Sequence, residues 1–313
     1  MDKMGTPYTE MLNDTTVSGW QKIKTMMSEV KALIKIGIIH SNLITTFAGF
    51  WLAIYFSGAS ITSNWDKFIL TMLGSALVIA GGCIFNNWYD VDIDPKMART
   101  KKRPTVTGFF SLKAVLTMGI ITTVIGLILL LLTTVEAAIF GFIGWFVYVV
   151  LYTMWSKRKT TLNTAVGSIS GAMPPLIGWA AISPTYHIVP IIMFLIMFIW
   201  QTPHFLSLAM KKTEDYRSAG VPMLPVVYGF EMTKRQIVIY IICLLPLPFF
   251  LTSLGTTFVV IATILNIGWL ILGFKGFYVK DDIKWANIIF IYSLNYLTII
   301  FLLMIVVTLP IFS

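Results

Sequence analysis

The sequence predicts an all-α protein that crosses a membrane several times. Of its 313 residues, 57% are hydrophobic and only 12% are charged. The mean hydropathy of +0.82 is far above that of water-soluble domains. Apolar runs long enough to span a bilayer as helices cover almost the whole chain after residue 32. We therefore expect one membrane domain rather than two soluble domains.

Nine apolar runs predict nine transmembrane helices. Residues 1–31 precede them and lack the apolar core and cleavage site of a signal peptide. We expect these residues to form a polar arm, partly disordered or lying on the surface, and residues 32–313 to form the transmembrane domain. The predicted helices are roughly 33–56, 68–85, 113–134, 137–155, 164–182, 188–209, 236–254, 257–278 and 285–309.

The basic residues predict the orientation. Lys67 is the only one of the 23 Lys and Arg residues that falls on one side of the nine runs, and the other 22 fall on the opposite side. The positive-inside rule then places the N-terminus in the cytoplasm of a plasma-membrane protein. The net charge of +9 follows from this topology, so we expect no nucleic-acid partner.

An acidic cluster follows the second apolar run, in the stretch NNWYDVDIDP. Asp90, Asp92 and Asp94 fit the first ligand positions of a calcium-binding EF-hand loop. Pro95, however, stands where that loop needs glycine, and Lys101 stands where it needs a bidentate glutamate. The calcium-loop interpretation is excluded.

A helical interpretation places three oxygen-bearing side chains together. If the second helix continues until just before Pro95, Asn86, Asp90 and Asp94 stack on one face and Asp92 points away. Such oxygen ligands suit Mg²⁺ that is bound to substrate phosphates. The cations that follow can hold phosphate oxygens. The pattern therefore favours a metal–diphosphate site over the alternative, a solvated loop whose acids balance its bases.

Three segments resemble the UbiA-type intramembrane prenyltransferase superfamily. Residues 86–104, NNWYDVDIDPKMARTKKRP, resemble its first aspartate motif, N-x-x-x-D-x-x-x-D. Residues 200–229, WQTPHFLSLAMKKTEDYRSAGVPMLPVVYG, and residues 162–179, LNTAVGSISGAMPPLIGW, resemble the branch of this superfamily that farnesylates haem. The resemblance covers the chain from about residue 30 onward.

The resemblance implies nine helices around a central cavity with an active-site mouth on the cytoplasmic side. It also implies an enzyme that uses Mg²⁺ to transfer a farnesyl group from farnesyl diphosphate to a vinyl group of haem B. Water completes this addition and diphosphate leaves. Residues 32–313 would then be a prenyltransferase domain. The superfamily's second motif is commonly D-x-x-x-D, whereas here Asp215 is followed four residues later by Ala219, which leaves the ligands of a second metal ion open.

The resemblance suggests roles for individual residues. Asn86, Asp90 and Asp94 would bind Mg²⁺, with Asp215 as a further carboxylate. Tyr152 would stabilise the allylic cation through its ring. His204 lies inside an apolar run, where ionisable groups are costly and often functional. It would ligate or orient haem, or else form a hydrogen bond to another helix. Asn42 would face the cavity. The candidate ligands of the diphosphate are the basic residues Arg99, Lys102, Arg103, Lys157 and Lys211.

Two other functions compete with this one. A polyprenyltransferase of quinone synthesis would act on a small aromatic acid and would favour a second D-x-x-x-D motif, which this sequence lacks. A membrane transporter would place charges at mid-membrane, whereas most acids here lie at one mouth. The lipid bilayer is an expected partner, and a haem A synthase or a terminal oxidase assembly is a candidate one.

Overall fold

The computed structural model describes residue 16 and residues 18–309, so most of the predicted polar arm lies outside the described residues. Within the described part, the regular elements are helices and no strand is present, which confirms the all-α class. The longer elements are α2 (Gly19–Leu33), α3 (Ile36–Ser57), α4 (Trp65–Tyr89), α5 (Leu112–Leu131), α6 (Val135–Phe146), a π-helix (Val147–Trp155), α7 (Asn163–Gly171), α8 (Met173–Ala180), α9 (Ile188–Lys211), α12 (Gly229–Leu244), a 3₁₀ segment (Leu247–Leu254), α13 (Thr256–Lys275) and α14 (Asp282–Val306).

Eight helical segments in the described part are long and apolar enough to cross a membrane. The remaining predicted span, 164–182, is divided between α7 and α8. Pro174 and Pro175 occupy the first turn of α8, where a missing N–H is harmless. The same residues cannot continue the hydrogen bonding of α7. Neither half reaches spanning length alone.

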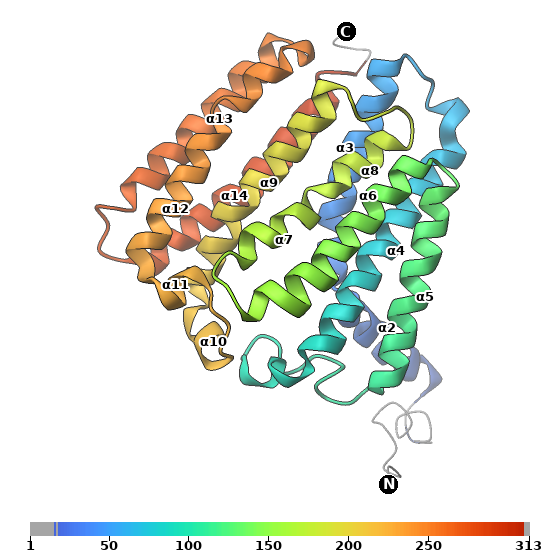
Figure 1. Cartoon of the computed structure of the whole chain (residues 1–313), viewed down its shortest axis with the longest axis vertical. Coiled ribbons are helices and arrows are strands. Elements are labelled where there is room, and N and C mark those ends of the chain that lie inside the picture. The colour runs from blue at the N-terminus through green and yellow to red at the C-terminus, as the bar shows by residue number, and fades with distance from the viewer. Residues whose placement is uncertain (1–15, 17, 310–313) are drawn as a thin grey trace.

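The helices pack as one bundle with both aspartate-bearing loops at the same end (Figure 1). α4 runs along α5, α3 packs on α8, and α9 packs on α12 and α14. The contact between α3 and α8 needs glycine. A Cβ atom on Gly178 would lie 1.9 Å from the Thr46 carbonyl oxygen, and one on Gly49 would lie 2.1 Å from the Pro175 carbonyl oxygen. Small residues thus bring these backbones together, as in other membrane bundles.

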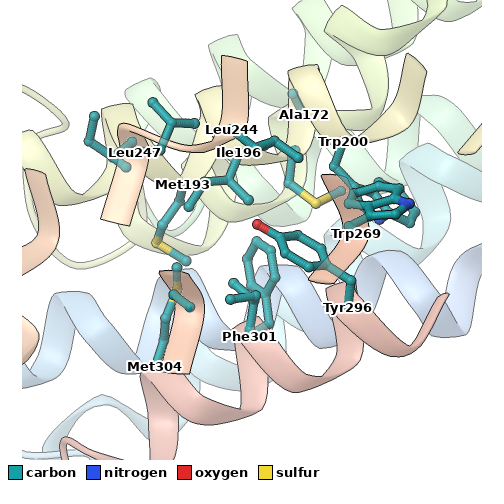
Figure 2. Packing of buried hydrophobic residues seen from close by; sticks show 14 of the residues in the cluster. Ala172, Met193, Ile196, Trp200, Leu244, Leu247, Trp269, Tyr296, Phe301 and Met304 are labelled. Atoms are coloured by element: carbon teal, nitrogen blue, oxygen red, sulfur yellow. The ribbon is translucent and has the colours of Figure 1, made fainter. Parts of the chain in front are cut away.

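A large apolar core fills the space between α9, α12, α13 and α14. Figure 2 shows Trp200, Trp269, Tyr296 and Phe301 gathered there with methionine and leucine side chains. Trp200 Nε1 donates to the Ser293 carbonyl oxygen at 2.8 Å, which ties α9 to α14. The core therefore fixes the position of α9, which leads into the second aspartate-bearing loop.

The prediction that the second helix continues to Asp94 as an α-helix was wrong. α4 ends at Tyr89 and is followed by two 3₁₀ turns, Asp90–Asp92 and Asp94–Lys96. Pro95 disfavours α-helical backbone at Asp94, and tighter turns satisfy the free carbonyls at a helix end. Accordingly, Ile93 N donates to the Asp90 carbonyl oxygen at 3.0 Å.

Candidate active site

Buried carboxylates lie where α4 ends. Asp90 and Asp94 are each 0% exposed, whereas the Asp92 side chain is 58% exposed. The inward position of Asp90 and Asp94 and the outward position of Asp92 agree with the expected division of these residues between two faces. Two buried carboxylates this close in the chain need cationic partners, because an unpaired buried charge is costly.

Asp90 and Asn86 belong to one hydrogen-bonded network. Asn86 Nδ2 donates to Asp90 Oδ2 at 2.9 Å and to Thr153 Oγ1 at 3.0 Å. Lys157 Nζ donates to Asp90 Oδ2, and Arg158 Nη2 lies 3.4 Å from Asp90 Oδ1. The carboxylate of Asp90 is thus held by groups from α4 and from the 3₁₀ turn Ser156–Arg158 that follows the π-helix.

Asp94 has one cationic partner and one oxygen without a partner. Arg103 Nη1 lies 2.6 Å from Asp94 Oδ2, while Asp94 Oδ1 is buried and accepts no hydrogen bond from the residues that the structure describes. Burial raises the pKa of Asp94, and the positive charge of Arg103 opposes this rise. An unpartnered buried carboxylate oxygen fits a cation ligand. The donor set of Asn86, Asp90 and Asp94 is therefore compatible with a hard divalent ion.

The side chains that could bind a metal ion at this site include an amide. Among the described residues, no three His, Cys, Asp or Glu side chains are grouped to hold an ion. Any ion at the end of α4 would take oxygens from two aspartates and one amide, and would complete its shell with water or substrate phosphate, as Mg²⁺ commonly does.

Lys35 belongs to the site, although we predicted only a role in membrane topology for it. Its Nζ donates to Asn86 Oδ1, and its backbone is left-handed, with φ 52°. Burial, followed by the positive charge of Arg103, lowers the pKa of Lys35 to about 7. The available signal was a cation at the start of the first predicted span. Thr153 and Arg158 were also missed, and Arg158 stands beside the predicted Lys157.

The remaining residues that we predicted to lie near the diphosphate differ in how far their side chains are buried. Arg103 and Lys157 are mostly buried and paired, whereas Arg99 and Lys102 are exposed on the same loop. Tyr152 stacks on Tyr148, with ring centroids 5.8 Å apart, and lies within electrostatic reach of Asp90, Arg99 and Arg103. Tyr152 from the π-helix, Lys157 from the turn after it and Arg103 from the loop between α4 and α5 therefore converge on the end of α4.

The second aspartate-bearing loop contacts the first. Asp215, in α10 (Thr213–Ser218), accepts a hydrogen bond from Ala98 N at 3.2 Å, and Ser218 Oγ donates to the Lys96 carbonyl oxygen at 2.9 Å. α10 is followed by α11 (Leu224–Val227). Asp215 also borders a hollow of about 430 Å³, which is lined by Met210, Lys211, Lys212, Thr213, Glu214, Asp215, Phe230 and Ile283.

Lys211 and His204 both contact α14 rather than the α4 end. Lys211 Nζ donates to Asn287 Oδ1 at 2.6 Å and lies 4.5 Å from the Phe290 ring centroid. His204 Nδ1 is 2.8 Å from Ser293 Oγ, and its ring is stacked between Trp200 and Phe290, each with its centroid 4.8 Å away.

Asn42 is separate from both groups. Its Nδ2 donates to the Ile38 carbonyl oxygen of its own helix at 2.8 Å. The structure thus brings together Asn86, Asp90, Asp94, Arg103 and Lys157, places Asp215 at the edge of this cluster, and gives Lys211, His204 and Asn42 other partners.

The arrangement can stabilise negative charge that develops on a bound phosphate group. Several cations surround two carboxylates at one mouth of an otherwise apolar bundle, so an incoming anion meets preorganised positive charge. Such charge is more effective in a low-dielectric site than in water.

Comparison with known proteins relates the chain to prenyltransferases. A family model described as the UbiA prenyltransferase family matches residues 42–309. A protein of Oceanobacillus iheyensis named protoheme IX farnesyltransferase is 67% identical over 314 residues, covering 100% of both chains.

Solved structures share the fold at low sequence identity. A digeranylgeranylglyceryl phosphate synthase has a TM-score of 0.73 at 20% identity and covers 90% of this chain and 98% of its own. A UbiA homologue from Archaeoglobus fulgidus, bound to DMAPP and Mg²⁺, has a TM-score of 0.65 at 14% identity and covers 88% and 99%. These likenesses show that the bundle has the UbiA fold.

Proposed function

The chain belongs to the UbiA prenyltransferase family, and on that premise we propose that it transfers a farnesyl group from farnesyl diphosphate to a vinyl group of haem B, with addition of water, giving haem O and diphosphate. The observation that carries this proposal is the 67% identity, over the full length of both chains, to a protein named protoheme IX farnesyltransferase. The enzyme is an intramembrane prenyltransferase.

The reaction breaks the C1–O bond of farnesyl diphosphate, the π bond of the vinyl group and one O–H bond of water, and it forms one C–C bond and one C–O bond. The C1–O bond of farnesyl diphosphate breaks and its electron pair leaves with the diphosphate. The vinyl π electrons of haem then form a C–C bond to the allylic carbon. The resulting cation beside the porphyrin takes up a water molecule, which loses a proton. The site must therefore stabilise an anion and a cation at the same time.

The end of α4 would hold the diphosphate. We assign Asn86, Asp90 and Asp94 as the ligands of Mg²⁺, and the unpartnered Asp94 Oδ1 supports this assignment. Asp215 would add a carboxylate from the second loop, which already contacts the first through Ala98. When bound, Mg²⁺ supplies Lewis-acid stabilisation of the leaving group.

Two groups of basic side chains, one mostly buried and one exposed, would bind the leaving diphosphate. Arg103 and Lys157, mostly buried beside the carboxylates, would hold its oxygens during bond cleavage. The exposed Arg99 and Lys102 would attract the substrate to the mouth, where their charges are screened by water. Lys211, the last residue of α9, would bind a diphosphate oxygen after its hydrogen bond to Asn287 breaks.

The apolar interior would hold the farnesyl chain and the haem. Tyr152 presents an aromatic ring near Asp90, where it can stabilise an allylic cation without attacking it. His204 lies among the aromatic side chains of α9 and α14 and would orient the haem. Asn42 would contact the haem from α3.

The finer topology belongs to the same proposal. α7 and α8 would together form one broken span, which gives nine spans around a central cavity. The N-terminus and the active-site mouth would then face the cytoplasm of a plasma-membrane protein, with residues 1–31 as an arm outside the prenyltransferase domain 32–313. The product would pass to a haem A synthase or a terminal oxidase assembly.

The activity is tested with purified protein in lipid, supplied with haem B, farnesyl diphosphate and Mg²⁺. Mass spectrometry should detect haem that has gained a farnesyl group and water. Omission of the metal ion should abolish the product. If the protein instead prenylates a hydroxybenzoate and leaves haem unchanged, it acts in quinone synthesis and the proposal is wrong.

A further inference from the structure

α2 carries an apolar stripe that the bundle does not cover. Trp20, Ile23 and Met27 recur at helical spacing on one face. Their side chains are 75%, 51% and 54% exposed, respectively. Of the residues in α2, only Leu33 is fully buried, where it packs with Ile84 and Val115. The stripe thus has no cover from the described part of the protein.

Basic residues border this stripe. Lys24 follows Trp20 by one turn, and Lys31 follows Met27 by one turn, so both lie along one edge of the apolar face. Lys22, the single acid of the helix, Glu29, and the polar Thr25 and Ser28 lie away from the stripe. The apolar face is thus combined with positive charge along one border.

The position of α2 places the stripe at a membrane boundary. α2 ends at Leu33, and α3, a candidate membrane span, begins at Ile36. Between them, Lys35 has left-handed backbone with φ 52°, so the two helices are not one straight rod. Figure 1 shows α2 at the lower end of the bundle, beside α4 and α5.

We propose that α2 lies in the interface of the leaflet from which α3 begins and binds its anionic lipid headgroups. Trp20, Ile23 and Met27 would enter the boundary between headgroups and acyl chains, and Lys24 and Lys31 would contact lipid phosphates. Amphipathic helices with apolar residues on one face and lysine at its borders bind membranes in this way.

Two features favour lipid over a protein partner. α2 ends at Leu33, three residues before a helix that enters the same bilayer, so lipid is always within reach of the stripe. Its flanking charges are positive, which complements an anionic leaflet but not a second copy of this stripe.

Binding of α2 to the membrane would also affect the position of active-site residues. Asn87 Nδ2 donates to the Leu33 carbonyl oxygen at 2.7 Å, and Lys35, two residues later, contacts Asn86. The end of α2 is therefore tied to the residues that precede Asp90, so α2 on the membrane would keep Lys35 in place.

The test measures the depth of single positions in the full chain. In a Cys243→Ser background, where Cys83 is buried, Ile23→Cys and Thr25→Cys are labelled with a fluorophore, and Met27→Cys is a second variant on the stripe. Each protein is placed in nanodiscs of phosphatidylcholine or of an equimolar mixture with phosphatidylglycerol, at one copy per disc and, for comparison, at two copies per disc. Only monodisperse protein is measured, and quenching by aqueous acrylamide is compared with quenching by brominated lipid.

We expect acrylamide to quench positions 23 and 27 at least about threefold more slowly than position 25 in the anionic discs, with brominated lipid showing the reverse order. Lys24→Gln combined with Lys31→Gln should abolish the difference between the two lipids. Equal acrylamide quenching at 23, 27 and 25 in both lipids would refute the proposal. Protection that occurs only in discs holding two copies would identify a second chain as the occupant and would also refute it. None of these readings depends on farnesyl transfer.

Discussion

Two loops at the same end of the bundle carry aspartates among lysines and arginines, yet they hold them differently. After α4, Asp90 and Asp94 are fully buried and paired with Lys157 and Arg103. After α9, Asp215 is partly exposed and accepts a hydrogen bond from Ala98 N. Since a charge acts more strongly in a low-dielectric site than in water, the difference teaches that burial, more than residue type, should rank these aspartates by their effect on catalysis.

The largest effect is expected at Asp90. Asp90→Ala should lower turnover by about 10³-fold or more, because it removes a metal ligand and leaves the Lys157 ammonium buried without its partner. The rate of haem farnesylation, measured by mass spectrometry on monodisperse protein, checks this. Asp90→Asn keeps the side-chain volume and is the matched control. A variant of either kind that retains a tenth of the activity would contradict the ranking.

Arg103 tests the second buried pair. Arg103→Gln should lower kcat/KM for farnesyl diphosphate by about 10²-fold, because it removes charge from the leaving group and leaves Asp94 unpaired. Arg103→Lys should lose less, since it keeps the charge but not the planar geometry of the guanidinium. Steady-state kinetics with varied farnesyl diphosphate measure both. If Lys102→Gln lowered kcat/KM as much as Arg103→Gln, the burial of a cation would not determine its contribution to catalysis.

An intermediate effect is expected at Asp215. Asp215→Asn keeps an acceptor for Ala98 N and removes only a partly exposed charge, so kcat/KM should fall by about tenfold. Asp215→Ala also removes the hydrogen bond from Ala98 N, so its kcat/KM should fall slightly further. The same kinetic assay separates these outcomes. If Asp215→Asn were as inactive as Asp90→Ala, the second loop would supply an equal metal ligand and the comparison of the two loops would fail.

The sequence was most informative where a single physical rule governs many residues. The bilayer requires about 20 apolar residues per helix, and this requirement located all eight segments that the structure shows to be of spanning length. The spacing of Asp90, Asp92 and Asp94 likewise predicted which of them face inward. The class of all-α membrane protein needed no tertiary information.

The partners of the site residues could not be predicted in the same way. Lys35 and Thr153 contact Asn86 from positions 51 and 67 residues away, and no local pattern in the sequence encodes such contacts. The change from α-helix to 3₁₀ turns after Tyr89 was also missed, because it depends on how Pro95 and the buried ion pairs act together. His204 could be recognised as unusual, but its bond to Ser293 arises from the packing of α9 on α14.

The smallest effect is expected at Asp92, which lies between the two buried aspartates. Its carboxylate accepts two hydrogen bonds from Arg158, each 2.8 Å long, but its side chain is 58% exposed. Exposed ion pairs contribute roughly 0–1 kcal/mol, so Asp92→Ala should retain activity within about threefold of the unmodified protein in the haem farnesylation assay. Arg158→Gln should cost more, because Arg158 also contacts Asp90 and the Tyr89 carbonyl oxygen. Equal losses for Asp92→Ala and Asp90→Ala would mean that the whole loop, rather than its buried face, carries the chemistry.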